Sequence, residues 1–198
     1  MWVTAALVPV AYLLGTFPSA DIVASGSGVD ITTAGSGNPG ASNVTRTLGW
    51  RKGVVVFALD ALKGALAALF GLWVGGRAGG YVLGGAAIVG HVFPFMRRLR
   101  GGKGVATGGG VIAVLHPLVG VAVSAIWLAV SRLTGKAAIA SIVAVVAAPV
   151  GLAIAGAPAW EFAAMVGLCS LLVVRHAGNI KRLVHREERG IGHGAAPS

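Results

Sequence analysis

Residues 105–131 read VATGGGVIAVLHPLVGVAVSAIWLAVS and contain no Asp, Glu, Lys or Arg. A helix of about 20 predominantly apolar residues is long enough to cross the hydrocarbon core of a bilayer. Proline removes a backbone hydrogen bond from a helix, so the dipeptide His116–Pro117 marks a kink or a break inside this run. We therefore interpret the stretch as membrane-embedded helix, either one kinked span or two short spans.

The rest of the chain has the same character. Of its 198 residues, 56% are hydrophobic and 11% are charged, whereas about 25% are charged in an average soluble domain. Residues 137–174 contain only one charged side chain, Glu161. Glycine fills 32 positions without a collagen-like period. This composition excludes an ordinary soluble domain and indicates a polytopic membrane protein whose glycines serve helix packing and turns.

The net charge of +10 fits a membrane protein better than a nucleic-acid-binding protein. DNA-binding domains carry their basic residues on a soluble scaffold, whereas the cytoplasmic loops of membrane proteins are rich in Lys and Arg. We expect membrane lipid around the chain, and no nucleic acid. The single cysteine, Cys169, excludes an intrachain disulfide and a multi-cysteine metal site, and we expect neither metal nor cofactor. Because no Lys or Arg precedes Arg46, the apolar N-terminus lacks the basic start of a secretory signal and is expected to remain as a span.

Charge clusters and Gly/Pro turns divide the apolar sequence into candidate membrane spans. A break at His116–Pro117 places fourteen of the sixteen Lys and Arg at one membrane face, with Arg77 opposite and Lys63 inside a span. Because basic loops stay in the cytoplasm, we predict an all-α transmembrane helix bundle with the N-terminus outside and the C-terminus cytoplasmic. Residues 1–183 form its single domain, followed by a polar, frayed cytoplasmic tail, residues 184–198. The seven predicted spans are residues 2–24, 53–74, 79–96, 104–115, 117–131, 138–156 and 159–175.

The first loop on the basic side, residues 35–46, reads GSGNPGASNVTR. Its glycines allow successive backbone amides to turn inward as an anion-binding nest. Arg46 can add a bidentate, charge-assisted contact to phosphate. The alternative is a flexible loop in which Ser42 or Asn43 caps the next helix.

The second basic loop contains Gly101-Gly102-Lys103-Gly104, followed by Thr107. Glycines permit close backbone approach to a phosphate, Lys103 supplies a positive charge, and a helix that starts near Gly104 offers its positive dipole end. The spacing is not that of a Walker A loop, so we do not expect nucleotide hydrolysis. The preceding arginines, Arg97, Arg98 and Arg100, are interpreted as topology determinants that contact anionic lipid.

The third basic segment, residues 175–183, reads RHAGNIKRL. On a helix, His176, Asn179 and Leu183 share one face. A lone histidine at a helix end is usually interfacial, but this one is predicted at the same membrane face as the two glycine-rich loops. We therefore expect the three segments to form one site.

Four polar side chains fall inside or beside the predicted spans. Asp60 and Lys63 are three residues apart and can pair on one helix face, either for function or as a structural tie. Ser141 either faces the pocket or bonds to its own helix. Glu161 is expected to be solvated at the opposite interface.

Together these motifs resemble the PlsY family, the bacterial acyl-phosphate:glycerol-3-phosphate acyltransferases of phospholipid synthesis. The resemblance spans nearly the whole chain, with mild departures at Thr16, Pro39 and Ser42. The residues that carry it are Leu14-Gly15-Thr16-Phe17-Pro18, residues 35–38 through Asn43 and Arg46, Asp60 with Lys63-Gly64, Gly90-His91 with Phe93-Pro94, Gly101-Gly102-Lys103-Gly104 with Thr107, and Arg175-His176 with Asn179-Ile180.

The resemblance implies transfer of a fatty acyl group from long-chain acyl phosphate to the sn-1 hydroxyl of glycerol 3-phosphate, on the cytoplasmic side of the bacterial inner membrane. The implied products are lysophosphatidic acid and phosphate. Glycerol 3-phosphate and its reacting hydroxyl are assigned to Ser36, Arg46, Lys103, His176 and Asn179, with Ser141 as a weaker candidate. The acyl phosphate is assigned to Gly101, Gly102 and Gly104, with Ser42, Asn43 and Thr107 nearby, and Gly37 and Asn38 complete the substrate-binding set.

Several alternatives remain open at this point. The base is either His176 or a substrate phosphate, whose second pKa is about 6, and we favour the substrate. The histidines lack an Asp five residues on, which excludes the H-x-x-x-x-D acyltransferases. A transporter of a phosphate ester is a rival function, although the motifs gather at one face and show no repeat symmetry. A structural protein with lipid-binding basic loops is another.

Overall fold

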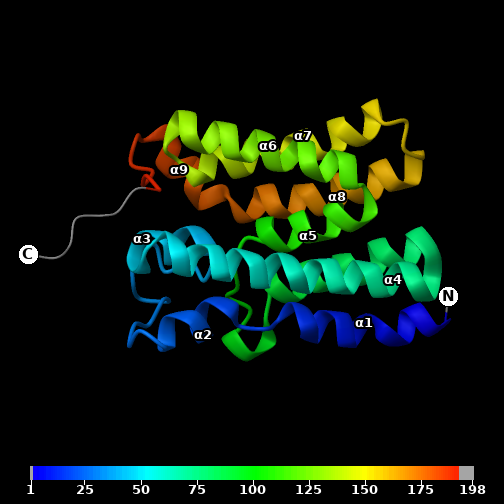
Figure 1. Ribbon diagram of the computed structural model, residues 1–198, viewed down its shortest axis with the longest axis horizontal. Coiled ribbons are helices and arrows are strands. Elements are labelled where there is room, and N and C mark those ends of the chain that lie inside the picture. The colour runs from blue at the N-terminus through cyan, green and yellow to red at the C-terminus, as the bar shows by residue number, and fades with distance from the viewer. Residues whose placement is uncertain (1, 192–198) are drawn as a thin grey trace, which may run out of the picture.

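The computed structural model describes residues 2–191, and this part of the chain consists of helices and loops without a β-strand (Figure 1). The all-helical prediction is therefore confirmed for these residues. The helices are α1 (Trp2–Gly15), α2 (Ser19–Ser25), α3 (Ala41–Leu48), α4 (Trp50–Val92), the short 3-10 helix η1 (Phe95–Arg97), α5 (Val105–Leu115), α6 (Pro117–Thr134), α7 (Ala137–Ile154), α8 (Ala159–Arg175) and α9 (Ala177–Val184).

Helix α4 is a hairpin of two antiparallel arms. Its 43 residues are interrupted at Gly75 and Gly76, whose φ/ψ angles of −147°/18° and 60°/−156° are not helical. The positive φ of Gly76 suits a residue without a Cβ. A Cβ on Gly71 would overlap the backbone of Gly79, so the two arms touch at glycines directly beside the turn. The two arms of α4 correspond to the two predicted elements, residues 53–74 and 79–96.

The uncharged run of residues 105–131 lies in two separate helices. Helix α5 ends at Leu115, His116 has the extended φ/ψ of −141°/74°, and α6 begins with Pro117 at its first position. Proline suits that position because its missing N–H would be unpaired there anyway. The predicted break is confirmed, and α5 is a short helix of 11 residues.

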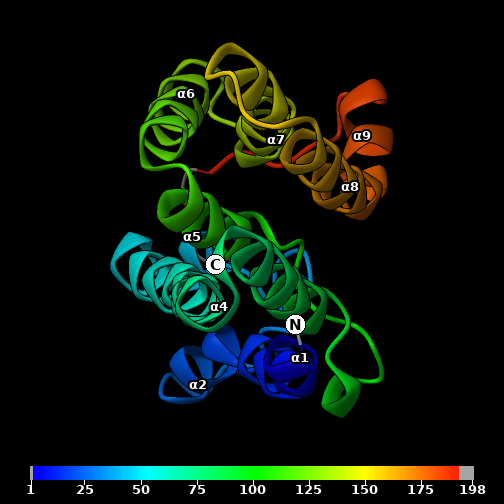
Figure 2. The ribbon, with the colours of Figure 1, turned by 90° about the vertical axis from the view of Figure 1, so that its right-hand side faces the viewer.

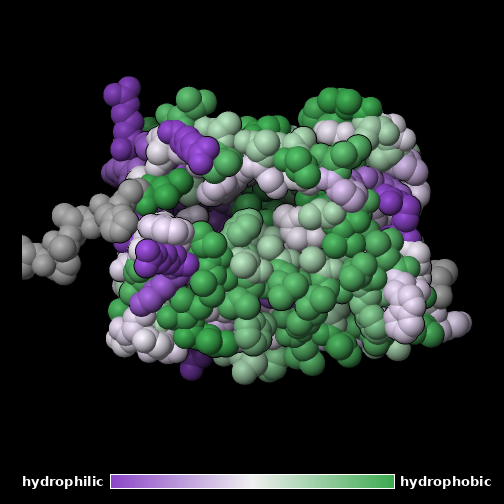
Figure 3. Space-filling view, viewed as in Figure 1, coloured by the Kyte–Doolittle hydropathy of each residue, from purple (hydrophilic) through white to green (hydrophobic). Residues whose placement is uncertain are grey.

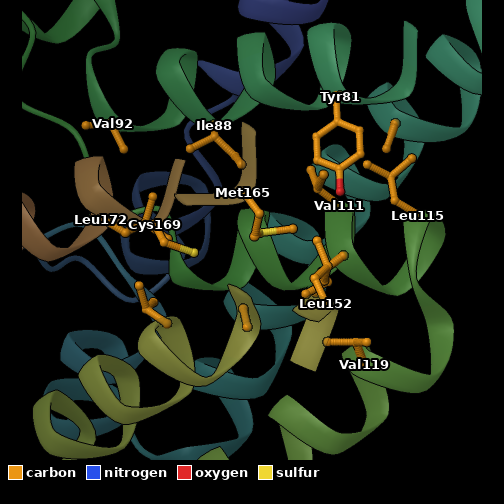
Figure 4. Packing of buried hydrophobic residues seen from close by; sticks show 14 residues of the cluster. Tyr81, Ile88, Val92, Val111, Leu115, Val119, Leu152, Met165, Cys169 and Leu172 are labelled. Atoms are coloured by element: carbon orange, nitrogen blue, oxygen red, sulfur yellow. The ribbon is translucent and has the colours of Figure 1, made fainter. Parts of the chain in front are cut away.

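The bundle has two parts that meet along α5 (Figure 2). In the first part α4 packs against α1, α3 and α5, and in the second α6 and α7 form a pair that α8 joins. Buried apolar side chains connect the parts: Figure 4 shows Ile88 and Val92 of α4 facing Cys169 and Leu172 of α8. The two parts are therefore held by one core, with α5 and α8 at the seam.

The two ends of the bundle differ in charge. We call the end that carries α3 and α9 the basic end (Figure 1). It holds Arg46 of α3, Arg175 at the end of α8, and Lys103, which bonds to Asn179 of α9. Between the ends the surface is largely apolar (Figure 3). Four helical segments are long and apolar enough to cross a membrane, and the bent pair α8–α9 adds a fifth; the four are Trp2–Ser25, Trp50–Arg97, Pro117–Thr134 and Ala137–Ile154.

At the end opposite the basic end, Glu161 corrects one expectation. Its carboxylate is fully buried rather than solvated, and both of its oxygens accept hydrogen bonds from Arg77. His116 Nε2 lies 2.9 Å from Glu161 Oε2, and Tyr81 Oη lies 2.8 Å from the same nitrogen. Because α8 carries an acidic side chain where α4 carries a basic one, the two helices are joined by an ion pair between a buried carboxylate and a half-exposed guanidinium. The sequence pattern did not predict this pair.

Candidate active site

Asn43 organises the first basic loop. Its side-chain Nδ2 donates to the carbonyls of Ile31 at 3.3 Å and Ala34 at 3.0 Å, and its Oδ1 accepts a hydrogen bond from Ser36 N at 2.8 Å. The N-cap of α3 is Gly40, so neither Ser42 nor Asn43 has the capping role that was considered. Asn43 therefore fixes the loop from inside and leaves the Ser36 hydroxyl at the surface.

The second loop crosses the end of α4 as a short glycine bridge, which we call the glycine loop (residues 101–104). Gly101 N donates to Val92 O and Gly102 N donates to His91 O, both at 3.1 Å. Gly104 has a φ of 82° and is the residue before α5. Because only glycine adopts this φ without strain, the loop can end directly at the helix N-terminus, where unpaired amides favour an anion.

Lys103 and the α8–α9 junction meet at the basic end. The Lys103 ammonium donates a hydrogen bond to Asn179 Oδ1. His176 is buried, and its Nδ1 lies 2.8 Å from the carbonyl of Leu172. Since a carbonyl only accepts, Nδ1 carries the proton and Nε2 remains free to accept one. The predicted shared face of His176 and Asn179 is thus directed inward, towards Lys103.

The segment after α9 folds back over this site. Glu188 is buried, and its carboxylate accepts hydrogen bonds from Asn179 Nδ2 and from Arg182 Nε, both at 2.8 Å. Arg189 donates to Gly35 O, and Arg46 donates to Gly190 O at 3.4 Å. The expected fraying is wrong for residues 185–191; residues 192–198 lie outside the described residues.

Sequence reasoning missed Glu188 as part of the site. The only signal was a pair of acidic residues, Glu187 and Glu188, between Arg186 and Arg189, and this pattern does not say where the tail folds. The hydrogen bond between Glu188 and the Asn179 side-chain nitrogen leaves Asn179 Oδ1 directed at Lys103.

The site has an excess of positive charge. Five cations gather around the carboxylate of Glu188, namely Arg46, Lys103, Arg175, Arg182 and Arg189. Burial lowers the pKa of Lys103 to about 8; Glu188 opposes this shift, and Arg46, Arg175 and Arg182 add to it. The Nε atoms of Arg46 and Arg175 are buried without a hydrogen-bond partner among the described residues. Such an arrangement favours an anion with several acceptor oxygens.

An apolar cavity adjoins the glycine loop. Leu172 and Ile88 lie against Gly104 and also line this cavity, so the cavity begins where the loop ends. It continues between α5, α6, α7 and α8, and the surface is hollowed between the α6–α7 pair and α4 (Figure 3). Its lining farther along includes Gly108, Ala144, Val145, Ala148 and Met165. The cationic cluster around Lys103 and the apolar cavity thus meet at the glycine loop.

The model of the family described as glycerol-3-phosphate acyltransferase matches residues 5–186. The chain belongs to the glycerol-3-phosphate acyltransferase family. Its curated relatives include glycerol-3-phosphate acyltransferase 1 of Deinococcus radiodurans, which is 40% identical over 182 residues, or 91% of this chain and 92% of that protein. The glycerol-3-phosphate acyltransferase of Aquifex aeolicus is 39% identical over 185 residues, or 92% of this chain and 96% of that protein.

Two solved structures of PlsY (YgiH), an integral membrane glycerol 3-phosphate acyltransferase, have the same fold. The glycerol 3-phosphate form is 37% identical, with a TM-score of 0.91 over 96% of each chain. The lysophosphatidic acid form has a TM-score of 0.89 and covers 96% of this chain and 95% of that one. The predicted resemblance is confirmed, and the glycerol-3-phosphate acyltransferase family membership decides for a membrane acyltransferase against the transporter and structural alternatives.

In this acyltransferase, some of the predicted site residues lie together around Lys103, and others make contacts elsewhere. Ser36, Gly37 and Asn38 lie in the loop that Arg189 contacts at Gly35, and Asn38 N lies 3.5 Å from Ser36 Oγ. Thr107 is fully buried in α5 and faces Gly64 of α4. Ser141 is buried in α7, where its hydroxyl accepts a hydrogen bond from Trp127 Nε1 at 3.1 Å. The site is thus centred on Arg46, Lys103, His176 and Asn179.

Proposed function

We propose that this acyltransferase uses a long-chain acyl phosphate as donor and acylates the sn-1 hydroxyl of glycerol 3-phosphate. The products are 1-acyl-glycerol 3-phosphate and inorganic phosphate. The observation that carries the proposal is that a cluster of cations around Lys103 lies next to an apolar cavity that reaches Gly104. Two phosphate-bearing reactants, one with a long apolar chain, need both environments in contact.

Glycerol 3-phosphate is assigned to the cationic cluster around Lys103. Arg46 and Lys103 hold its phosphate, and the buried, unpaired Nε of Arg46 is available for that contact. His176 and Asn179 lie beside Lys103 and orient the reacting hydroxyl. Ser36 completes the pocket from the first loop. Ser141 keeps a weaker assignment because its hydroxyl already bonds to Trp127.

The acyl phosphate is assigned to the glycine loop and the cavity. Its phosphate is assigned to the backbone of Gly101, Gly102 and Gly104. The amides at the start of α5 are the donors, because those of Gly101 and Gly102 already bond to the carbonyls of Val92 and His91. Its acyl chain enters the cavity past Leu172. Ser42 lies near the phosphate. Asn43 and Thr107 act indirectly, because Asn43 is bonded within its own loop and Thr107 packs on α4.

Catalysis consists of positioning and charge stabilisation. The sn-1 hydroxyl oxygen attacks the acyl carbonyl carbon, the bond from that carbon to the phosphate oxygen breaks, and the phosphate leaves with its electron pair. Amides and cations around the glycine loop stabilise the oxyanion and the departing phosphate. The hydroxyl proton passes to a substrate phosphate, whose second pKa of about 6 suits this role, with Nε2 of His176 as the alternative acceptor.

We further propose that the chain crosses a bacterial cytoplasmic membrane seven times. Helix α4 would be about 64 Å long if straight, about twice the hydrocarbon thickness, and its reversal at Gly75–Gly76 divides it into two spans. Helix α5 is the short fourth span, and the glycine loop lies before it at the basic end. The positive-inside rule places the basic end in the cytoplasm, with the C-terminus, and leaves the N-terminus outside.

Turnover by purified protein tests the proposal. In lipid, with glycerol 3-phosphate and palmitoyl phosphate, the protein should release phosphate and form lysophosphatidic acid in equal amounts. Lys103→Ala should abolish both products, while Lys181→Ala should not, because Lys181 is an exposed lysine of the same basic segment. Acylation from another donor but not from palmitoyl phosphate would contradict the proposal.

A further inference from the structure

A second polar cluster lies inside the bundle, beside the glycine loop. Asp60 of α4 is buried; its Oδ1 pairs with Lys63 Nζ at 2.8 Å and accepts a hydrogen bond from Ser19 Oγ at 2.9 Å. Lys63 also donates to the carbonyl of Phe17 at 3.1 Å. These contacts join α4 to the junction of α1 and α2. Taken alone, they describe a structural tie.

The same carboxylate also faces a buried histidine that touches the glycine loop. His91 Nδ1 lies 3.6 Å from Asp60 Oδ1. The opposite edge of the ring, at Nε2, occupies the space that a Cβ on Gly102 would take. The carbonyl of His91 also accepts the Gly102 amide, at 3.1 Å. His91 therefore supports Gly102 through both its main chain and its side chain.

The surroundings of His91 restrict what else its ring can do. Asp60 and Lys63 face it from its own helix, and Arg175 acts on it from α8. The ring is buried beneath the loop, where it lines a small cavity together with Asp60, Lys63 and Gly102. A side chain in this position can fix the loop backbone that it touches.

We propose that His91, held by Asp60, is a positioning residue that fixes the Gly101–Gly102 backbone and thereby places Lys103 and the amides at the start of α5. The inference rests on the proposed role of the glycine loop as a phosphate site. A displacement of about 1 Å in such a site can cost on the order of 100-fold in rate. This positioning role also gives Asp60 a function beyond the structural tie to α1 and α2.

Kinetics of His91→Ala and Asp60→Asn test the inference against a matched control. We expect the KM for palmitoyl phosphate to rise about tenfold in both variants, with a smaller change in kcat. The control is Glu161→Gln, which also removes the ion pair of a buried carboxylate but lies at the opposite end. It should lower the thermal midpoint while leaving KM unchanged. Variants of His91 and Asp60 that behave like this control would overturn the inference.

A steric rescue supplies an independent readout. Gly102→Ala should lose most activity, because its Cβ overlaps the buried ring of His91 rather than the substrate. Removing that ring in the double variant Gly102→Ala/His91→Ala should raise kcat/KM about tenfold above Gly102→Ala. A double variant no better than Gly102→Ala overturns the inference. Wild-type turnover of palmitoyl phosphate, measured alongside, decides the proposed function separately.

If His91→Ala fails to fold, His91→Gln takes its place in both experiments. Glutamine keeps a buried amide towards Asp60 but removes the flat ring edge from Gly102, so the rise in KM should persist. A folded His91→Gln enzyme with wild-type KM for both substrates would overturn the inference.

Discussion

Lys103 combines burial with a dense cationic environment, and its protonation should therefore be visible in kinetics. Burial lowers its pKa to about 8, so the ammonium form is present below that pH and is lost as the pH rises through it. We predict that kcat/KM, which reports on the free enzyme, falls above pH 8 by about tenfold per unit. Arginine stays charged in this range, so Lys103→Arg should retain some activity without this alkaline decline. A decline at the same pH in Lys103→Arg would assign it to another group.

His176 decides between the two candidate bases. A general base contributes about 10²–10⁴ to the rate. Because we favour a substrate phosphate as base, His176→Ala should lower kcat by less than about 100-fold and raise the KM for glycerol 3-phosphate. Steady-state kinetics of the purified variant give both values. Loss of turnover with unchanged affinity would instead make His176 the base.

For single residues, the sequence predicted which side chains lie near one another better than it predicted which atoms each side chain contacts. Arg46, Lys103, His176 and Asn179 were predicted as one group because their loops share a membrane face. Asn43 was expected near the substrate, yet its amide is used within its loop. That outcome depends on which carbonyls the fold brings within 3.3 Å of it, and a local pattern contains no such information.

Among the elements, α5 depends on a close approach to α4. A Cβ on Gly110 would overlap the backbone of Ala61, and one on Gly64 would overlap the backbone of Thr107. Gly109, the neighbouring residue, has open space around its Cα. The glycines of α5 thus contact the backbone of α4 at some positions and not at others. This difference arises from helix rotation, which composition does not reveal.

We predict opposite effects from two adjacent substitutions in α5. Gly110→Ala forces backbone apart and should destabilise the protein by about 1–3 kcal/mol. Gly109→Ala should be neutral or stabilising, by up to about 1 kcal/mol, because alanine favours the helix. Thermal unfolding in detergent measures both. Equal midpoints for the two variants would contradict the close packing of α4 on α5.

In the whole molecule, the two helical parts enclose the apolar cavity next to the glycine loop. The sequence did not predict this cavity. It predicted the apolar helices correctly, because their boundaries are marked by charge, Gly and Pro. The cavity depends on how α5 to α8 pack, and its lining residues come from four helices and the end of α4. Their shared position is a property of the assembled bundle rather than of any one segment.

The cavity should set the length of acyl chain that the enzyme accepts. Ala148 lines it about 6 Å farther along α7 than Ala144, since a helix rises about 1.5 Å per residue. Ala148→Phe should therefore obstruct the distal part, reducing kcat/KM for palmitoyl phosphate by about tenfold or more while octanoyl phosphate is affected little. Val146→Phe is the matched control, because Val146 is an exposed residue of the same helix. Equal losses of kcat/KM with both donors would mean that the acyl chain lies elsewhere. A selective loss with palmitoyl phosphate would place the acyl chain between α5 and α8.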